Sequence, residues 1–133
     1  MSRGLRNCNP GNIRQSRSNF KGEVRPSRDS AFKQFESMAY GYRAMFVLLN
    51  SYHKRYGLTT IREMISRWAP PTENFTEGYI RLVSERSGIA ADAEVDSRSE
   101  RDMVPIVAAM SEIENGTEAA MTDVYEGWKL FSR

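Results

Sequence analysis

The 133-residue sequence contains one cysteine and one histidine, and this scarcity excludes several kinds of site. Cys8 has no second cysteine with which to form an intramolecular disulfide. Cys8 and His53 are not spaced like zinc ligands. A Ser/His/Asp triad would have to use His53, which lies at the edge of the apolar stripe of a predicted helix. We therefore expect no metal site, no cofactor and no histidine-dependent triad.

Long apolar runs are also missing from the sequence. No stretch reaches the roughly 18 apolar residues of a membrane-spanning helix. The opening residues, MSRGLRNCNPG, lack the apolar core of a signal peptide. We expect a protein made in the cytoplasm without a membrane span, which another component must release if it acts outside the cytoplasm.

The composition, with 40% hydrophobic and 27% charged residues, is typical of one globular domain. A net charge of +2 says little about partners, but positive residues predominate near the N-terminus. Such a segment could contact nucleic acid or an anionic polymer. Because aromatic residues are not regularly interleaved with these charges, we favour a solvated surface and expect no nucleic-acid partner.

Two regions differ in their patterns. Residues 1–36 contain the turn Asn9-Pro10-Gly11-Asn12 and short apolar stretches near 13–14 and 31–35, which predict a small β-hairpin in a β/loop region. Residues 37–133 predict about five helices, from their apolar periodicity and cap residues. These helices are expected at 38–56, from 61 to before Pro70, from about 75 to Gly88, from 99–102 to 115, and from 122 or 123 onward. The predicted class is α+β, mostly α-helical, with its β part first.

The helix that ends near Asn115 carries an acid in an unusual position. At 100° per residue, Glu114 falls on the same apolar stripe as Met103, Val107 and Met110. Glu112 falls on the opposite, solvent-facing side. Burial and the negative end of the helix dipole would both disfavour an ionised Glu114, as a general acid requires. The alternative is a helix that simply ends here, with Glu114 turned out to water.

Four segments resemble a group of phage and prophage domains related to lysozymes: RGLRNCNPGNIR, FKQFES running into AYGYRA, YGLTTIREMISRWAPPTENFTEGYI, and EIENG. The resemblance covers nearly the whole chain, and its most specific part is WAPPTENFTEGYI. Two positions depart from the group, which usually has Asn at Cys8 and His at Ile113. The group looks like bacterial glucosaminidases, goose-type lysozymes and lytic transglycosylases.

The resemblance implies a single lysozyme-like domain over residues 1–133. In those enzymes a helix ending in the catalytic Glu precedes the β-hairpin, whereas here the hairpin-like region comes first. We interpret this as a circularly permuted order, which is admissible because the termini of a domain are commonly close together.

The resemblance also implies cleavage of the β-1,4 bonds between the aminosugars of peptidoglycan, with Glu114 as the general acid. A lysozyme needs a second carboxylate or a positioned water, whereas a lytic transglycosylase needs only one Glu. The candidates for a second catalytic carboxylate are Glu36 and Glu73. Glu23 and Asp29 are further candidates. The spacing of these residues does not decide between hydrolysis and the transglycosylase reaction. It also does not indicate which carboxylate would act together with Glu114.

Amides and aromatic rings are the groups that bind sugars. We expect Asn9, Asn12, Arg14 and Tyr79 to bind the substrate. Trp68 and Tyr52 lie on apolar helix stripes and are predicted to belong to the core.

The expected partners are peptidoglycan strands and other virion proteins, with action at the cell wall either from the virion or during lysis. The alternative is a non-catalytic virion structural or glycan-binding protein that keeps a lysozyme-like fold. The departures at Cys8 and Ile113 favour that alternative, and the apolar placement of Glu114 favours an enzyme.

Overall fold

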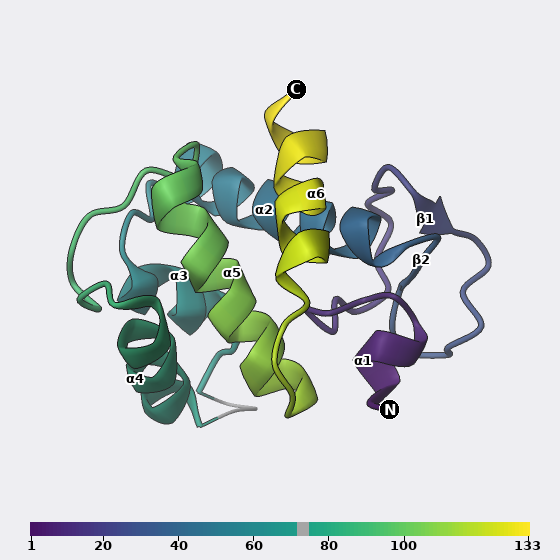
Figure 1. Cartoon of the computed structure of the whole chain (residues 1–133), viewed down its shortest axis with the longest axis horizontal. Coiled ribbons are helices and arrows are strands. Elements are labelled where there is room, and N and C mark those ends of the chain that lie inside the picture. The colour runs from purple at the N-terminus through teal and green to yellow at the C-terminus, as the bar shows by residue number, and fades with distance from the viewer. Residues whose placement is uncertain (72–74) are drawn as a thin grey trace.

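The computed structural model describes residues 1–71 and 75–133, which form a mostly helical α+β fold (Figure 1). Six helices and one two-stranded sheet occur in these residues. They are α1 (Arg3–Arg6), β1 (Glu23–Val24), β2 (Gln34–Phe35), α2 (Met38–Tyr56), α3 (Ile61–Trp68), α4 (Thr76–Ser87), α5 (Glu100–Asn115) and α6 (Met121–Ser132). The predicted class and the early position of the β part are confirmed. The four-residue helix α1, capped by Ser2, was not predicted.

Local capping residues set the helix ends. The side chains of Ser37, Thr60 and Ser99 each accept a hydrogen bond from a backbone N–H in the first turn of α2, α3 and α5, which satisfies one of the unpaired donors there. Gly57 and Gly116 end α2 and α5 in the left-handed conformation that glycine adopts without steric cost. The helices α2 to α5 therefore begin and end close to where the sequence predicts, and α6 starts one or two residues earlier than predicted.

The core lies where α2 packs against α6 and α5 packs against α4. Figure 1 shows α5 running diagonally across the molecule, with α4 beside its C-terminal half. The Phe46 ring of α2 lies 5.0 Å from the Trp128 ring and 6.0 Å from the Phe131 ring, both from α6. No described helix combines the length and the apolar character needed to cross a membrane.

The β part is smaller than predicted. Strands β1 and β2 pair antiparallel, with Glu23 opposite Phe35 and Val24 opposite Gln34. Of the predicted pairing of 13–14 with 31–35, the structure shows one antiparallel bridge, between Arg14 and Phe32. Apart from α1, the remaining backbone of this region forms loops. They are held by a few backbone hydrogen bonds, such as those from Gln15 to Ala31 and from Lys33 to Ile13, and by many side-chain hydrogen bonds.

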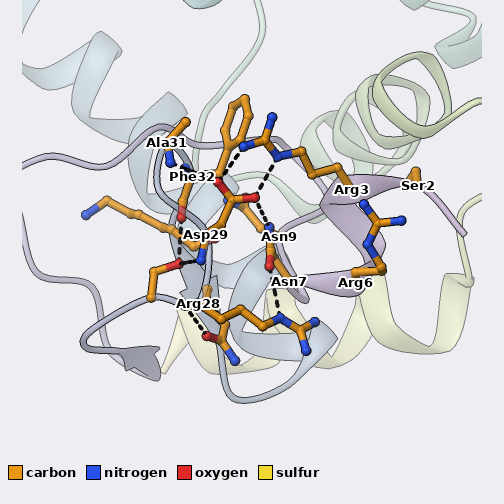
Figure 2. A network of polar contacts seen from close by, with 12 residues as sticks. Ser2, Arg3, Arg6, Asn7, Asn9, Arg28, Asp29, Ala31 and Phe32 are labelled. Carbon is orange, nitrogen blue, oxygen red and sulfur yellow. Dashed lines mark hydrogen bonds and ion pairs between the residues drawn. The ribbon is translucent and has the colours of Figure 1, made fainter.

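Asp29 is the centre of one of these polar networks (Figure 2). Its carboxylate accepts two hydrogen bonds from Arg3, at 2.6 and 2.7 Å, and one from the Asn7 amide at 3.0 Å. It also accepts the backbone N–H groups of Ala31 and Phe32. These bonds, the one from Arg3 foremost, hold the pKa of Asp29 far below its usual range. The network thereby fixes the backbone on both sides of residue 30.

This network predicts acid-sensitive stability. A carboxyl group with a lowered folded-state pKa stabilises the fold above its unfolded pKa of about 3.9, and that contribution is lost as the pH falls further. We expect Asp29→Asn to lower Tm at pH 7, and the Tm difference from wild type to shrink between about pH 5 and pH 2. Asp92→Asn, at a surface pair with Arg62 whose Asp92 side chain is 75% exposed, should change Tm little. A Tm difference for Asp29→Asn that does not vary with pH would contradict this.

The two ends of the chain lie on opposite sides of the molecule in Figure 1. A simple circular permutation places the new termini next to each other, where a former loop was opened. The permuted order that the sequence suggested therefore gains no support from the position of the termini.

Candidate active site

Glu114 lies in the last turn of α5, at a cleft of about 420 Å³. The cleft forms where the N-terminal segment, α2, α3 and the end of α5 meet. Its described lining residues are Gly11, Asn12, Ile13, Arg14, Phe32, Leu48, Tyr52, Arg67, Trp68, Ala69, Pro70 and Glu114. Among these twelve, Glu114 is the only carboxylate.

Two neutral donors hold the Glu114 carboxylate. The Tyr79 hydroxyl, from α4, donates to Oε2 at 2.9 Å, and the Asn12 amide donates to Oε1 at 3.0 Å. Asn12 adopts a left-handed backbone with φ of 49°, which Asn accepts more readily than most residues. One oxygen is thus held by the N-terminal segment and the other by α4. These two hydrogen bonds give the carboxylate one defined orientation at the cleft.

Tyr79 is suited to act as a permanent donor. Its side chain is buried, with the residue 9% exposed. Burial, the negative charge of Glu114 and the hydrogen bond to it raise the pKa of Tyr79 well above 10, while the Trp68 side chain acts weakly in the opposite direction. The phenol therefore stays protonated at neutral pH and can always donate to Glu114.

The end of α5 is bound to the N-terminal segment next to this carboxylate. The Asn115 amide donates to the Pro10 carbonyl at 2.9 Å, and the Ser2 hydroxyl donates to Asn115 Oδ1 at 2.7 Å. A Cβ atom at Gly4 would lie 2.6 Å from the Asn115 side chain and 2.7 Å from that of Asn12. Only glycine allows α1 to come this close, so Gly4 helps to set the position of Asn12.

Glu114 is less buried than the apolar stripe predicted. Met103, Val107 and Met110 are fully buried, whereas Glu114 is half-buried because it lies one turn beyond the packed part of α5. Nor does its carboxylate simply point to water, since protein donors hold both oxygens. Glu112 is separate from this site: its carboxylate meets Arg86 at 3.5 Å and does not line the cleft.

Three aromatic side chains line the cleft: Phe32, Tyr52 and Trp68. The Tyr52 and Trp68 rings meet edge to face with centroids 6.5 Å apart. The prediction that these two residues belong to the core was incomplete, because both are only partly buried and reach the cleft surface. Helical periodicity locates the inward face but does not separate side chains inside the core from those at its edge.

The other predicted site residues have different positions. Arg14 lines the cleft, as a binding residue should. Asn9 does not: it is 0% exposed, and its amide bonds the backbone of Ile13 and Lys33, so the structure corrects its role from sugar contact to loop support. Glu36 is exposed and is not among the cleft residues, and Glu73 lies outside the described residues. No cluster of three His, Cys, Asp or Glu side chains suited to a metal ion occurs in the described parts of the chain.

The two departures from the lysozyme-related pattern lie away from the cleft lining. Cys8 and Ile113 are partly buried and pack against the core. Cys8 has φ of 51°, a left-handed conformation in which Asn is common and Cys is not. Having Cys in place of Asn at this position therefore strains the backbone and leaves the cleft surface unchanged.

Comparison with known proteins gives one clear relationship. No protein-family model matches the chain. Over 119 residues the chain is 35% identical to Protein P5 of Pseudoalteromonas phage PM2, an alignment that covers 87% of this chain and 72% of that protein. At this identity and coverage, the chain belongs to the same phage protein family as Protein P5 of phage PM2.

Proposed function

We propose that this chain is a peptidoglycan-cleaving glycosidase with a lysozyme-like fold, in which Glu114 is the general acid. The observation that carries the proposal is the hydrogen-bonded set Asn12–Glu114–Tyr79 at a cleft lined by aromatic and basic side chains. Aromatic rings pack on the apolar faces of sugar rings, and a single oriented carboxyl group can protonate a glycosidic oxygen.

In the proposed reaction, the Glu114 carboxyl group gives its proton to the glycosidic oxygen as the bond to the anomeric carbon breaks. The leaving sugar departs with a hydroxyl group, and positive charge develops on the remaining sugar ring. Glu114 is then a carboxylate, and the donors Tyr79 and Asn12 stabilise it in place. A later proton transfer back to Glu114 completes the cycle.

The second half of the reaction depends on what attacks the sugar. A second carboxylate would lie about 5–5.5 Å from Glu114 in a retaining enzyme and about 6.5–9.5 Å away in an inverting one. The described cleft residues supply none, which favours the lytic transglycosylase route. In that route Glu114 takes the proton from the sugar's own 6-hydroxyl, whose oxygen closes an anhydro ring. Glu73 remains the candidate second carboxylate for a hydrolase.

The relationship to a phage protein fits association with a virion and with other virion proteins. Action at the bacterial cell wall, either from the virion or during lysis, is part of the proposal and follows from the proposed chemistry of Glu114. The alternative is a non-catalytic virion protein that binds glycan. Cys8 and Ile113 do not line the cleft, so neither departure changes the groups that would meet a glycan there.

Digestion of purified peptidoglycan by the full chain, with mass analysis of the released muropeptides, tests the proposal. We expect anhydro-muropeptides, which lack one water relative to hydrolytic products. Products with free reducing ends would support glycosidase activity by hydrolysis instead of the transglycosylase reaction. Binding to peptidoglycan without any product would refute enzymatic activity and favour the alternative, a glycan-binding virion protein.

A further inference from the structure

Two arginines in the cleft have no acidic partner among the described residues. Arg14 and Arg67 both line the cleft, and neither forms an ion pair in the described part of the chain. Other arginines are paired: Arg3 with Asp29, for example, and Arg86 with Glu112. Within the described residues, the two guanidinium groups in the cleft therefore have no charge partner and can bind an external anion.

Both guanidinium groups are held over aromatic rings. Arg14 Cζ lies 5.0 Å from the centroid of Phe32, and Arg67 Cζ lies 3.7 Å from the centroid of Tyr56 and 5.5 Å from that of Tyr52. The backbone explains the contacts. Arg14 and Phe32 are opposite residues of an antiparallel bridge, so their side chains share a face. Tyr52 and Tyr56 are one turn apart on α2 and lie on the same side of the helix.

This arrangement prepares the arginines for a carboxylate. Stacking fixes the plane of a guanidinium and leaves its N–H edge open, so less side-chain entropy is lost when a ligand binds. The fork of N–H donors matches the two oxygens of a carboxylate. Among the described cleft residues, Arg14 and Arg67 outweigh the single acid Glu114, by one positive charge when Glu114 is ionised and by two when it carries the proton that it gives in the proposed reaction.

We propose that Arg14 and Arg67 bind carboxylate groups of the glycan, so that the cleft prefers an acidic aminosugar polymer to a neutral one. This inference rests on the proposed function and adds the chemical class of its substrate. Muramic acid carries a lactyl carboxyl group that is free once the stem peptide has been removed, and the stem peptides carry carboxylates of their own. Either would give the glycan the negative groups that the two arginines fit.

The test compares glycan strands that differ only in their carboxyl groups. Strands stripped of stem peptides by an amidase carry free lactyl carboxylates, and carbodiimide activation followed by borohydride converts these groups to neutral alcohols. Binding is measured by calorimetry on the full chain carrying Glu114→Gln, so that no strand is cleaved. We expect the acidic strands to bind about 10-fold more tightly, the effect of one charge-assisted hydrogen-bonded pair.

Variants assign the preference to the two arginines. Arg14→Gln and Arg67→Gln should each reduce it, and the double variant should abolish it while the neutral strands still bind. Arg101→Gln, at an exposed position on α5 away from the cleft, is the matched control and should keep the preference.

Three results would overturn the inference. Equal affinity for both strands, together with cleavage by the wild type, would refute it and leave the proposed function intact. Failure to bind or cleave either strand would overturn both. Tighter, arginine-dependent binding of single-stranded DNA than of the acidic strands would identify the cleft as a nucleic-acid site instead.

Discussion

Glu114→Gln is expected to reduce peptidoglycan cleavage about 10²- to 10⁴-fold, the usual contribution of a positioned general acid. Glutamine has almost the same shape: its carbonyl oxygen can accept the Asn12 amide while its own amide donates to the Tyr79 hydroxyl oxygen. It has no proton to give to a glycosidic oxygen. Initial rates of muropeptide release, measured for equal amounts of folded protein, give the comparison.

Glu112→Gln is the matched control for this experiment. It removes the same charge from the same helix two residues earlier, but Glu112 faces Arg86 and the backbone of Ala119 instead of the cleft. We expect it to keep wild-type activity. Activity that survives in Glu114→Gln would refute Glu114 as the acid and make Glu73 the next candidate, since Glu36 does not line the cleft.

A stability measurement separates chemistry from folding in Glu114→Gln. The glutamine can place either its NH2 group or its carbonyl oxygen against the Asn12 amide. Only with the carbonyl oxygen facing Asn12 are the hydrogen bonds to Asn12 and to Tyr79 both kept, the second with the Tyr79 oxygen as acceptor. Because that arrangement is available, Tm should change little. A large fall in Tm would show that the carboxylate is needed to join α4 and the N-terminal segment to α5.

The helices were predictable because their signals are local. Ser37, Gly57, Ser99 and Gly116 satisfy or end the backbone hydrogen bonds of their own helices, whatever the rest of the fold does. Helix α1 was missed because four residues are too few to show a helical period.

The site was predictable only in part, since it depends on contacts between distant segments. Asn12, Arg14, Tyr79 and Glu114 were predicted as site residues from motif and position. The structure places Asn12, Arg14 and Glu114 in the cleft lining, and Tyr79 buried with its hydroxyl on Glu114 instead of at the cleft surface. Asn9 has the same amide chemistry as Asn12, yet a hydrogen bond to residue 33 turns it inward. No feature of the sequence near Asn9 indicates which of the two amides the loop will use.

Lys33→Met is expected to lower the free energy of unfolding by about 3–5 kcal/mol, as when one partner of a buried ion pair is removed. Lys33 is 0% exposed, and its ammonium group donates to both Glu23 oxygens at 3.1 Å and to the carbonyls of Ser16 and Ser18 at 3.3 and 2.8 Å. Without it, the Glu23 carboxylate stays buried, at 4% side-chain exposure. Arg25, 3.0 Å away, compensates in part, so the lower end of the range is expected.

Chemical denaturation measures this loss, and Lys129→Met provides its control. Lys129 pairs with Glu126 on the surface, where the two side chains are 66% and 53% exposed, so its removal should cost no more than about 0.5 kcal/mol. An equal cost for the two lysine variants would show that Lys33 does not hold the loop together.

The double variant Lys33→Met with Glu23→Gln shows why Lys33→Met is destabilising. The cost can come from losing the Lys33–Glu23 ion pair or from leaving the buried Glu23 carboxylate without a partner. If the cost of Lys33→Met comes mainly from the unpaired carboxylate, removing that charge should recover part of the lost stability, so that the double variant is more stable than Lys33→Met alone. The same loop leads into Phe32, which pairs with Arg14 at the cleft. We therefore expect Lys33→Met to weaken the binding of acidic glycan strands at temperatures where the protein is still folded, and the double variant to restore it in step with stability.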